Sequence, residues 1–296
     1  MASLKEVKTR INSIRSTRKI TSAMKMVASA KLHKMQGAVE NMLPYQQKLD
    51  KILNNFLSAD LPVQSPFILK RELKRIAIVA FSSNTSLCGA YNANVIRQFN
   101  SVYKKYKEKL GAENILVYPI GNKIELAVKK MGIIPQGSYQ SIVNKPSYQE
   151  TSLLAQKLMD LFLNKEIDQV EVIYHHFKSS GVQELQSMTY LPIDLSKVSV
   201  GAIEEPTEKS VYNNDYIIEP SPVELLANLL PMVLKYELFT SAVDSNASEH
   251  SARTIAMQIA TDNADDIIRD LTKLYNKSRQ QSITNELLDI MGGSAK

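Results

Sequence analysis

The chain has 296 residues, enough for about two domains and a sizeable hydrophobic core. Its 44% apolar and 22% charged residues are typical of a soluble globular protein and exclude the disordered and collagen-like classes. The single cysteine, Cys88, excludes an intramolecular disulfide framework and a multi-cysteine zinc site. The longest uncharged stretch, Ile76 to Ile96, contains too many Ser, Thr and Asn residues to span a bilayer.

The net charge of +6 is concentrated at one end of the chain. Residues 1–36 contain nine basic side chains and one acid, Glu6, so the rest of the chain is slightly negative. This basic segment predicts an acidic partner, and nucleic acid, an anionic membrane and an acidic protein surface all fit. A mitochondrial presequence is a fourth interpretation, whereas a secretory signal is excluded because no apolar segment precedes Met24.

A first helix is predicted from about Ser3 to about Leu57, bent near Pro44. Its apolar residues recur every three or four positions, as in the seam of a coiled coil. The middle of the seam is polar, at Arg18, Thr21 and Lys25. This pattern favours a coiled coil whose middle contacts another partner, and a poorly packed heptad is the alternative.

An α/β domain is predicted in the middle of the chain. The predicted strands are Arg75–Phe81, Asn114–Ile120, Val170–Lys178 and Glu184–Leu195. One predicted helix follows the loop after the first strand and ends near Lys109. Two more cover Lys123–Met131 and Ser147–Leu163. This alternation predicts a Rossmann-like three-layer α/β domain with a mostly parallel sheet and room for an antiparallel edge strand. Gly201–Asn214 is predicted to be a loop.

A last helix is predicted from about Pro222 to Gly292, with a kink at Pro231. About 70 helical residues exceed what a globular domain needs. The predicted fold class is therefore α/β: a long antiparallel two-helix coiled coil formed by the N- and C-terminal segments, with the α/β domain inserted. The predicted domains are residues 1–60 for the N-terminal coiled-coil helix, 61–218 for the inserted domain and 219–296 for the C-terminal coiled-coil helix.

No motif in the sequence indicates a reaction centre. The loop after Phe81 has the place of a nucleotide-binding turn, but it contains one glycine, Gly89, and no phosphate-binding motif. Cys88 has no obvious base beside it and is interpreted as a packed residue. His175 and His176, adjacent on a predicted strand, point to opposite faces and cannot share one metal ion. The sequence predicts no catalytic residue, no metal and no cofactor.

Both terminal helices and the central loop carry a family resemblance. The N-terminal helix reads KITSAMKMVA over residues 19–28, and the C-terminal helix contains ASEH at 247–250, ATDNA at 260–264 and YNK at 275–277. The central loop has SS at 82–83 and LCG at 87–89, with Asn84, Thr85 and Ser86 where the family has Asp-Arg-Gly. With these motifs the chain resembles the gamma subunit of the F-type rotary ATP synthase over nearly its whole length, more loosely from about residue 100 to 215.

The resemblance implies a non-catalytic rotor shaft. Such a shaft couples proton-driven rotation of a membrane c ring to conformational changes of the catalytic beta subunits in ATP synthesis, and the reverse in hydrolysis. The implied partners are three alpha and three beta subunits, the epsilon subunit and the c ring, with no nucleic acid and no directly bound nucleotide. Members of the family begin a few residues before the same heptad pattern, which makes the presequence interpretation weaker. The resemblance then implies a peripheral protein at the cytoplasmic face of a bacterial inner membrane.

The resemblance also implies three contact sites. Beta-subunit contacts are expected from Arg18, Met24, Lys25, Arg253, Arg279, Gln280, Thr284 and Glu286, an apical bearing from Ile283, Leu287, Leu288 and Ile290, and c-ring contacts from Tyr216 and Glu219. Small and polar residues that would keep the shaft from adhering to its sleeve are expected on the outer faces, namely Ser245, Asn246, Ser248, Thr254 and Gln258. If the two terminal helices run antiparallel with Leu57 level with Pro222, Met24 lies level with residues 253–255. Residues 279 to about 290 then extend beyond the first helix as a single helix.

Two other functions fit the sequence. A coiled-coil tether with a regulatory α/β module would bind nucleic acid or membrane through its basic first helix, and that binding would be sensitive to salt. An enzyme built on the α/β domain would bind or turn over a nucleotide by itself.

Overall fold

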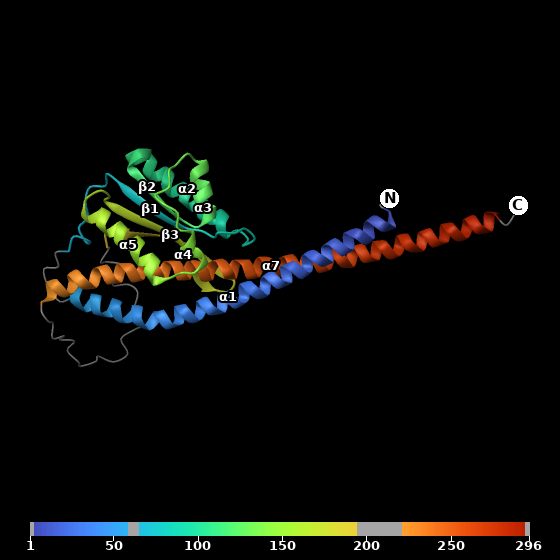
Figure 1. Cartoon of the computed structure of the whole chain (residues 1–296), viewed down its shortest axis with the longest axis horizontal. Coiled ribbons are helices and arrows are strands. Elements are labelled where there is room, and N and C mark those ends of the chain that lie inside the picture. The colour runs from blue at the N-terminus through green and yellow to red at the C-terminus, as the bar shows by residue number, and fades with distance from the viewer. Residues whose placement is uncertain (1–2, 59–64, 194–220, 294–296) are drawn as a thin grey trace. The chain divides into compact units, whose positions relative to one another are not determined.

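A computed structural model describes residues 3–58, 65–193 and 221–293 (Figure 1). The described chain divides into two compact units. The smaller unit contains the described residues up to Ala30 and from Arg253 onward, and the larger unit contains those between Lys31 and Ala252. Helix α1, Leu4–Ser58, and helix α7, Pro222–Gly293, each contribute residues to both units. The predicted loop at 201–214 and the predicted c-ring residues Tyr216 and Glu219 lie outside the described residues.

The larger unit contains a four-stranded sheet in the order β2-β1-β3-β4. Strand β1 (Ile76–Phe81) pairs in parallel with β2 (Ile115–Ile120) and with β3 (Gln169–Ser179). Strand β4 (Val182–Leu191) pairs with β3 in the antiparallel direction and forms one edge. The four predicted strands are therefore confirmed, although β4 begins two residues earlier than predicted and ends at Leu191.

Helices cover both faces of the sheet (Figure 1). Helices α2 (Tyr91–Leu110) and α3 (Asn122–Lys130) pack on the face formed by Ile76, Ile78 and Ala80. Helix α5 (Tyr148–Leu163) and the first part of α7 pack on the face formed by Ala77, Val79 and Phe81. Because successive strand residues point to opposite faces, a strand covered on both sides has to be apolar throughout, as β1 is.

Two short elements complete the larger unit and were not predicted. A 3₁₀ turn, Ala112–Asn114, leads into β2, and helix α4, Gln140–Asn144, precedes α5. Five helical residues are too few to show an apolar period in a sequence.

In the smaller unit, α1 and α7 lie side by side in opposite directions (Figure 1). The buried residues of this unit include Val7, Ile11, Thr21, Ala28, Met257 and Ala264. The four buried residues of α1 all belong to the seam of three- and four-residue intervals predicted for this helix. None of the described helices combines the length and the apolar character needed to cross a membrane.

The register of this helix pair differs from the predicted one. Thr21 Oγ1 lies 2.9 Å from Thr261 Oγ1, whereas the predicted register places Gln258 level with Thr21. The prediction is wrong by about one helical turn. A pattern of three- and four-residue intervals is satisfied again after a shift of that size, so it cannot distinguish the two registers.

Helix α7 continues past the N-terminal end of α1 (Figure 1). It stays helical to Gly293, and every residue from Ile283 to Met291 is exposed. As predicted, this end of α7 does not fold back onto α1.

Candidate functional site

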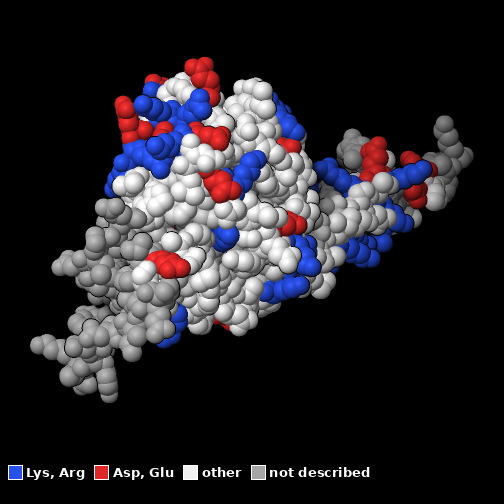
Figure 2. Space-filling model, turned by 60° about the vertical axis from the view of Figure 1, so that its left-hand side comes forward, with Lys and Arg blue, Asp and Glu red and all other residues white. Residues whose placement is uncertain are grey.

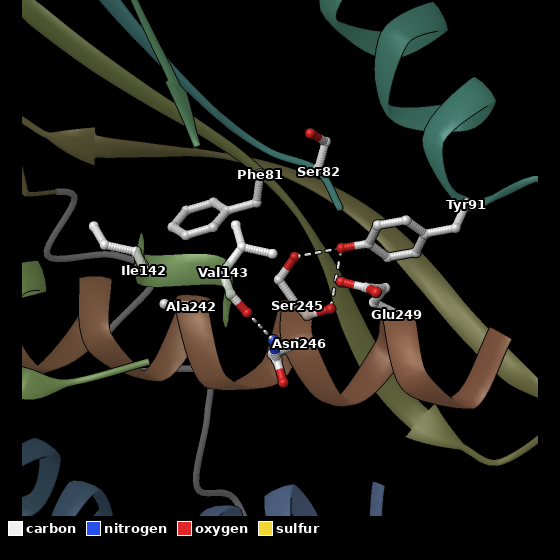
Figure 3. A pocket seen from close by; sticks show the side chains of 9 residues that line it. All are labelled: Phe81, Ser82, Tyr91, Ile142, Val143, Ala242, Ser245, Asn246 and Glu249. Carbon is white, nitrogen blue, oxygen red and sulfur yellow. Dashed lines mark hydrogen bonds between the residues drawn. The ribbon is translucent and has the colours of Figure 1, made fainter. Parts of the chain in front are cut away.

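Helix α7 is buried in the larger unit at every position from Ser241 to Ser251, although most of these residues are polar. The hydroxyl of Tyr91, at the start of α2, lies 2.7 Å from Ser245 Oγ and donates to the Ser245 carbonyl oxygen at 3.0 Å (Figure 3). Asn246 Nδ2 donates to the Val143 carbonyl oxygen at 2.6 Å. The polar side chains of this run therefore form hydrogen bonds inside the α/β domain.

The expectation that Ser245, Asn246 and Ser248 lie on an outer face is wrong. Their exposed fractions are 3%, 5% and 0%. In a sequence, small polar residues on a long helix are typical of a solvated surface. Here the same residue types satisfy backbone and hydroxyl groups that would otherwise be buried without partners.

Strand β3 contributes two histidines with different surroundings. His175 is buried and stacks on Tyr91, with ring centroids 4.3 Å apart, and burial lowers its pKa to about 4. His176 Nδ1 lies 2.6 Å from Asp244 Oδ2 on α7. The described residues contain no group of three His, Cys, Asp or Glu side chains that could hold a metal ion. The His175 ring thus packs against Tyr91, and the His176 ring pairs with Asp244.

The carboxyl end of β1 is the place where open α/β sheets bind ligands, because connections leave the sheet there in opposite directions. In this chain, a pocket at that end is lined by Phe81 and Ser82 on one side and by Ser245, Asn246 and Glu249 of α7 on the other (Figure 3). The space that remains is about the size of one water molecule. Helix α7 thus occupies the position that a nucleotide takes in related architectures.

The loop after β1 is held by Asn84, the first residue of the Asn84-Thr85-Ser86 segment. Its Nδ2 donates to the Gln140 carbonyl oxygen at 2.9 Å and to Asn144 Oδ1 at 2.8 Å, and its Oδ1 accepts from the Asn122 N–H at 3.0 Å. An aspartate could accept the last bond but could not donate the first two. The asparagine therefore joins α3 and α4 in a way that the Asp of the family motif could not.

The substitution Asn84→Asp is expected to lower the free energy of unfolding by about 1–3 kcal/mol, because it removes two donors and places a carboxylate beside two oxygen acceptors. Urea unfolding followed by tyrosine fluorescence would measure this loss. Thr85→Asp, which adds the same charge at the exposed neighbouring position, is the matched control. Equal losses in the two variants would contradict the role assigned to Asn84.

The polar middle of the α1 seam meets partners on α7. Arg18 Nε lies 2.5 Å from Asp265 Oδ1, and Thr21 bonds Thr261, four residues before Asp265. These two residues therefore have partners within the chain itself, and the predicted contact with another partner stays a prediction. Thr261 and Asp265 share one face of α7, and this i, i+4 spacing is the signal that sequence analysis missed. Lys25, the third polar residue, is half-buried.

The Arg18–Asp265 ion pair is weak. The two side chains are 46% and 43% exposed, and ion pairs with that exposure contribute about 0–1 kcal/mol. Lys and Arg side chains gather along the helical segment on the face shown in Figure 2. Breaking the pair so that the Arg18 guanidinium can bind another carboxylate would therefore require little free energy.

The remaining predicted contact residues differ in exposure. Met24 is half-buried, and Arg253 is 8% exposed. The four polar residues expected near the end of α7 are exposed, namely Arg279, Gln280, Thr284 and Glu286. The four apolar residues expected to form a bearing are 48–68% exposed, namely Ile283, Leu287, Leu288 and Ile290. The end of α7 therefore presents both polar and apolar side chains to whatever surrounds it.

These observations define a class of protein. A pair of terminal helices carries an inserted α/β domain, and the usual ligand position of that domain is occupied by the chain's own helix. What the described residues offer to a partner is an exposed helical surface.

Comparison with known proteins agrees with this class. A profile of the ATP synthase family matches residues 3–295. The ATP synthase gamma chain of Bacteroides fragilis is 68% identical over 294 residues, which cover 99% of each chain, and that of Parabacteroides distasonis is 46% identical over 100% of this chain and 99% of its own length. The chain belongs to the ATP synthase gamma chain family.

Solved structures share the fold. A chain of the Euglena gracilis mitochondrial ATP synthase OSCP/F1/c-ring structure aligns with a TM-score of 0.64 and 18% identity, covering 99% of this chain and 93% of that one. A chain of the rotor structure from the same organism aligns with a TM-score of 0.63 and 16% identity, covering 95% and 98%.

Proposed function

We propose that this chain is the central rotor shaft of an F-type ATP synthase. It would couple proton-driven rotation of a membrane c ring to conformational changes of the catalytic beta subunits in ATP synthesis, and the reverse in hydrolysis. The full-length similarity to gamma chains supports this proposal. The observation that carries it is the end of α7, which continues past α1 with every residue from Ile283 to Met291 exposed.

In the proposed shaft, α1 and α7 act as an antiparallel coiled coil, with residues 1–60 and 219–296 as its two helices. Residues 61–218 form a Rossmann-like three-layer foot. The chain itself is non-catalytic, binds no nucleotide or nucleic acid, and works with three alpha subunits, three beta subunits, an epsilon subunit and the c ring. It lies peripherally at the cytoplasmic face of a bacterial inner membrane, with Tyr216 and Glu219 on the c ring.

The proposed beta-subunit contacts use both charge and shape. Arg18 and Lys25 face acidic beta-subunit side chains, and the weak pairing of Arg18 with Asp265 allows the guanidinium to exchange partners during rotation. Met24 and Arg253 complete this level. Nearer the end of α7 the contacts come from Arg279, Gln280, Thr284 and Glu286. A shaft that presents different side chains to three identical subunits can stabilise a different conformation in each.

The proposed bearing uses the apolar residues at the end of α7. Ile283, Leu287 and Ile290 repeat at intervals of four and three, so they lie along one side of the helix, and Leu288 lies beside them. A single helix cannot bury such a stripe by itself. An apolar collar formed by the surrounding subunits would cover it.

Co-purification tests the proposed function directly. The tagged chain is expressed with the alpha, beta and epsilon subunits of its own complex, and the expected product is an ATP-hydrolysing assembly with alpha, beta and gamma in the ratio 3:3:1. The reversal variant Arg18→Glu with Lys25→Glu should assemble but lose ATP-driven proton pumping in membranes. Recovery of the chain without alpha and beta subunits would refute the proposal, and unchanged pumping by the variant would refute the charge contact.

A further inference from the structure

Strand β3 is longer than its parallel neighbour. It runs from Gln169 to Ser179, but its pairing with β1 ends at Ile173. On the other side, β4 remains paired with β3 as far as Ser179, with a register irregularity after Phe177. The backbone of β3 beyond Ile173 therefore lacks a strand on the β1 side.

Only every second residue of a strand directs its backbone hydrogen-bonding groups to a given side. In a β-strand, the N–H and C=O groups of one residue point to the same side, and those of the next residue point to the other. The backbone N–H and C=O groups of His175 and Phe177, which lie two residues apart, should therefore point to the side that β1 leaves open. Buried backbone groups of this kind need hydrogen-bond partners from some other source.

Helix α7 supplies those partners. The Phe177 N–H donates to Asp244 Oδ1 at 2.8 Å, and Ser248 Oγ donates to the His175 carbonyl oxygen at 3.1 Å. Just beyond the strand, Ser251 Oγ donates to the Ser180 carbonyl oxygen at 2.6 Å.

The three side chains are suited to this task. Asp244, Ser248 and Ser251 follow one another at intervals of four and three, which places them on one face of α7. Their exposed fractions are 8%, 0% and 1%, so water does not compete freely for these bonds. Asp244 is the strongest of the three partners, because its second oxygen lies 2.6 Å from His176 Nδ1 and a carboxylate acceptor makes a charge-assisted bond.

We propose that Asp244, Ser248 and Ser251 form a latch, in which a helix takes the place of the missing strand beside β3 and passes the rotation of the α/β domain to α7. The transfer of rotation rests on the proposed rotor function. The bonding of the latch does not, and the two parts are tested separately. In this proposal Asp244 is a positioning residue that acts through the backbone of β3.

The bonding is tested by hydrogen exchange in the isolated full chain. Asp244→Ala should accelerate exchange of the Phe177 amide on the order of tenfold or more, because it loses a charged acceptor. Asp244→Asn keeps an acceptor oxygen and should stay near the parent rate. Asp266→Ala removes an exposed aspartate from the same helix and should have no effect at Phe177. Unchanged exchange in Asp244→Ala would overturn the latch.

A second variant covers the case in which Asp244→Ala does not fold. Ser248→Ala with Ser251→Ala removes two donors but leaves carbonyl oxygens that water can reach on local opening. It should accelerate exchange of amides in 174–180 and leave those of 115–120 in β2 unchanged. Equal acceleration in both segments would show general destabilisation and would overturn the latch.

The transfer of rotation is tested in the assembled complex, whose formation with the parent chain tests the proposed function independently. Asp244→Ala, or the double serine variant, should retain ATP hydrolysis while at least halving the protons pumped per ATP hydrolysed. A variant that only assembled poorly would lower both activities together and leave this ratio unchanged. An unchanged ratio with accelerated exchange would overturn the transfer role, and Asp266→Ala should preserve the ratio.

Discussion

Leu230→Ala is expected to lower the free energy of unfolding by about 3 kcal/mol, a large part of the roughly 5–15 kcal/mol of a typical domain. Leu230 has no exposed surface and belongs to the core cluster that also contains Phe67, Leu158 and Phe162. The substitution would leave a cavity between α7 and the sheet. Urea unfolding followed by tyrosine fluorescence reports on this unit, where buried tyrosines such as Tyr118 and Tyr190 lie.

Leu288→Ala is the matched control for this measurement. It makes the same change in the same helix at a residue that is 61% exposed, and it should alter the free energy of unfolding by less than about 0.5 kcal/mol. If the two variants were equally stable, α7 would not be part of the α/β core.

His175→Phe is expected to make the protein more resistant to acid. Burial lowers the pKa of His175 to about 4, whereas an unfolded histidine titrates near 6.5. Between these values the unfolded chain binds a proton that the folded chain does not. The folded state is therefore favoured above pH 6.5 and loses up to about 3 kcal/mol as the pH falls toward 4. Phenylalanine cannot titrate and retains a ring for stacking on Tyr91.

The measurement compares the free energies of unfolding at pH 7.5 and pH 5. The parent chain should lose about 2 kcal/mol more than His175→Phe over this interval, because the remaining groups titrate alike in both. His33→Phe, at an exposed position of α1, should behave as the parent does. Equal acid sensitivity of the parent and His175→Phe would contradict the burial mechanism.

The elements that could be predicted from sequence are those with a strong period. The apolar run at Ile76–Phe81 and the long intervals without proline or glycine indicate strands and helices by themselves. The contacts of the buried α7 run could not be predicted. Serine and asparagine at 245 and 246 look the same in a sequence whether they contact water or a carbonyl oxygen such as that of Val143. The difference depends on which loops fold against them.

Among the predicted contact residues, too, some positions could be predicted from the sequence and others could not. The exposed end of α7 follows from the length of the two helices, so the sequence could place Ile283 and Leu287 outside the helix pair. The pairing of Arg18 with Asp265 depends on register, and register follows from the shapes of the packed side chains rather than from their period.

The contribution of α7 to the sheet core determines when that core can form during synthesis. Leu226, Leu230, Leu234 and Leu238 cover one face of a sheet whose last strand ends at Leu191. All four strands therefore leave the ribosome before α7, and the part of this face that α5 does not cover stays exposed to water until residues near 238 follow. Since domains fold as units during translation, the α/β domain completes its fold only when most of the chain has been made. A nascent chain that stops before α7 presents the uncovered part of this apolar face to chaperones and proteases.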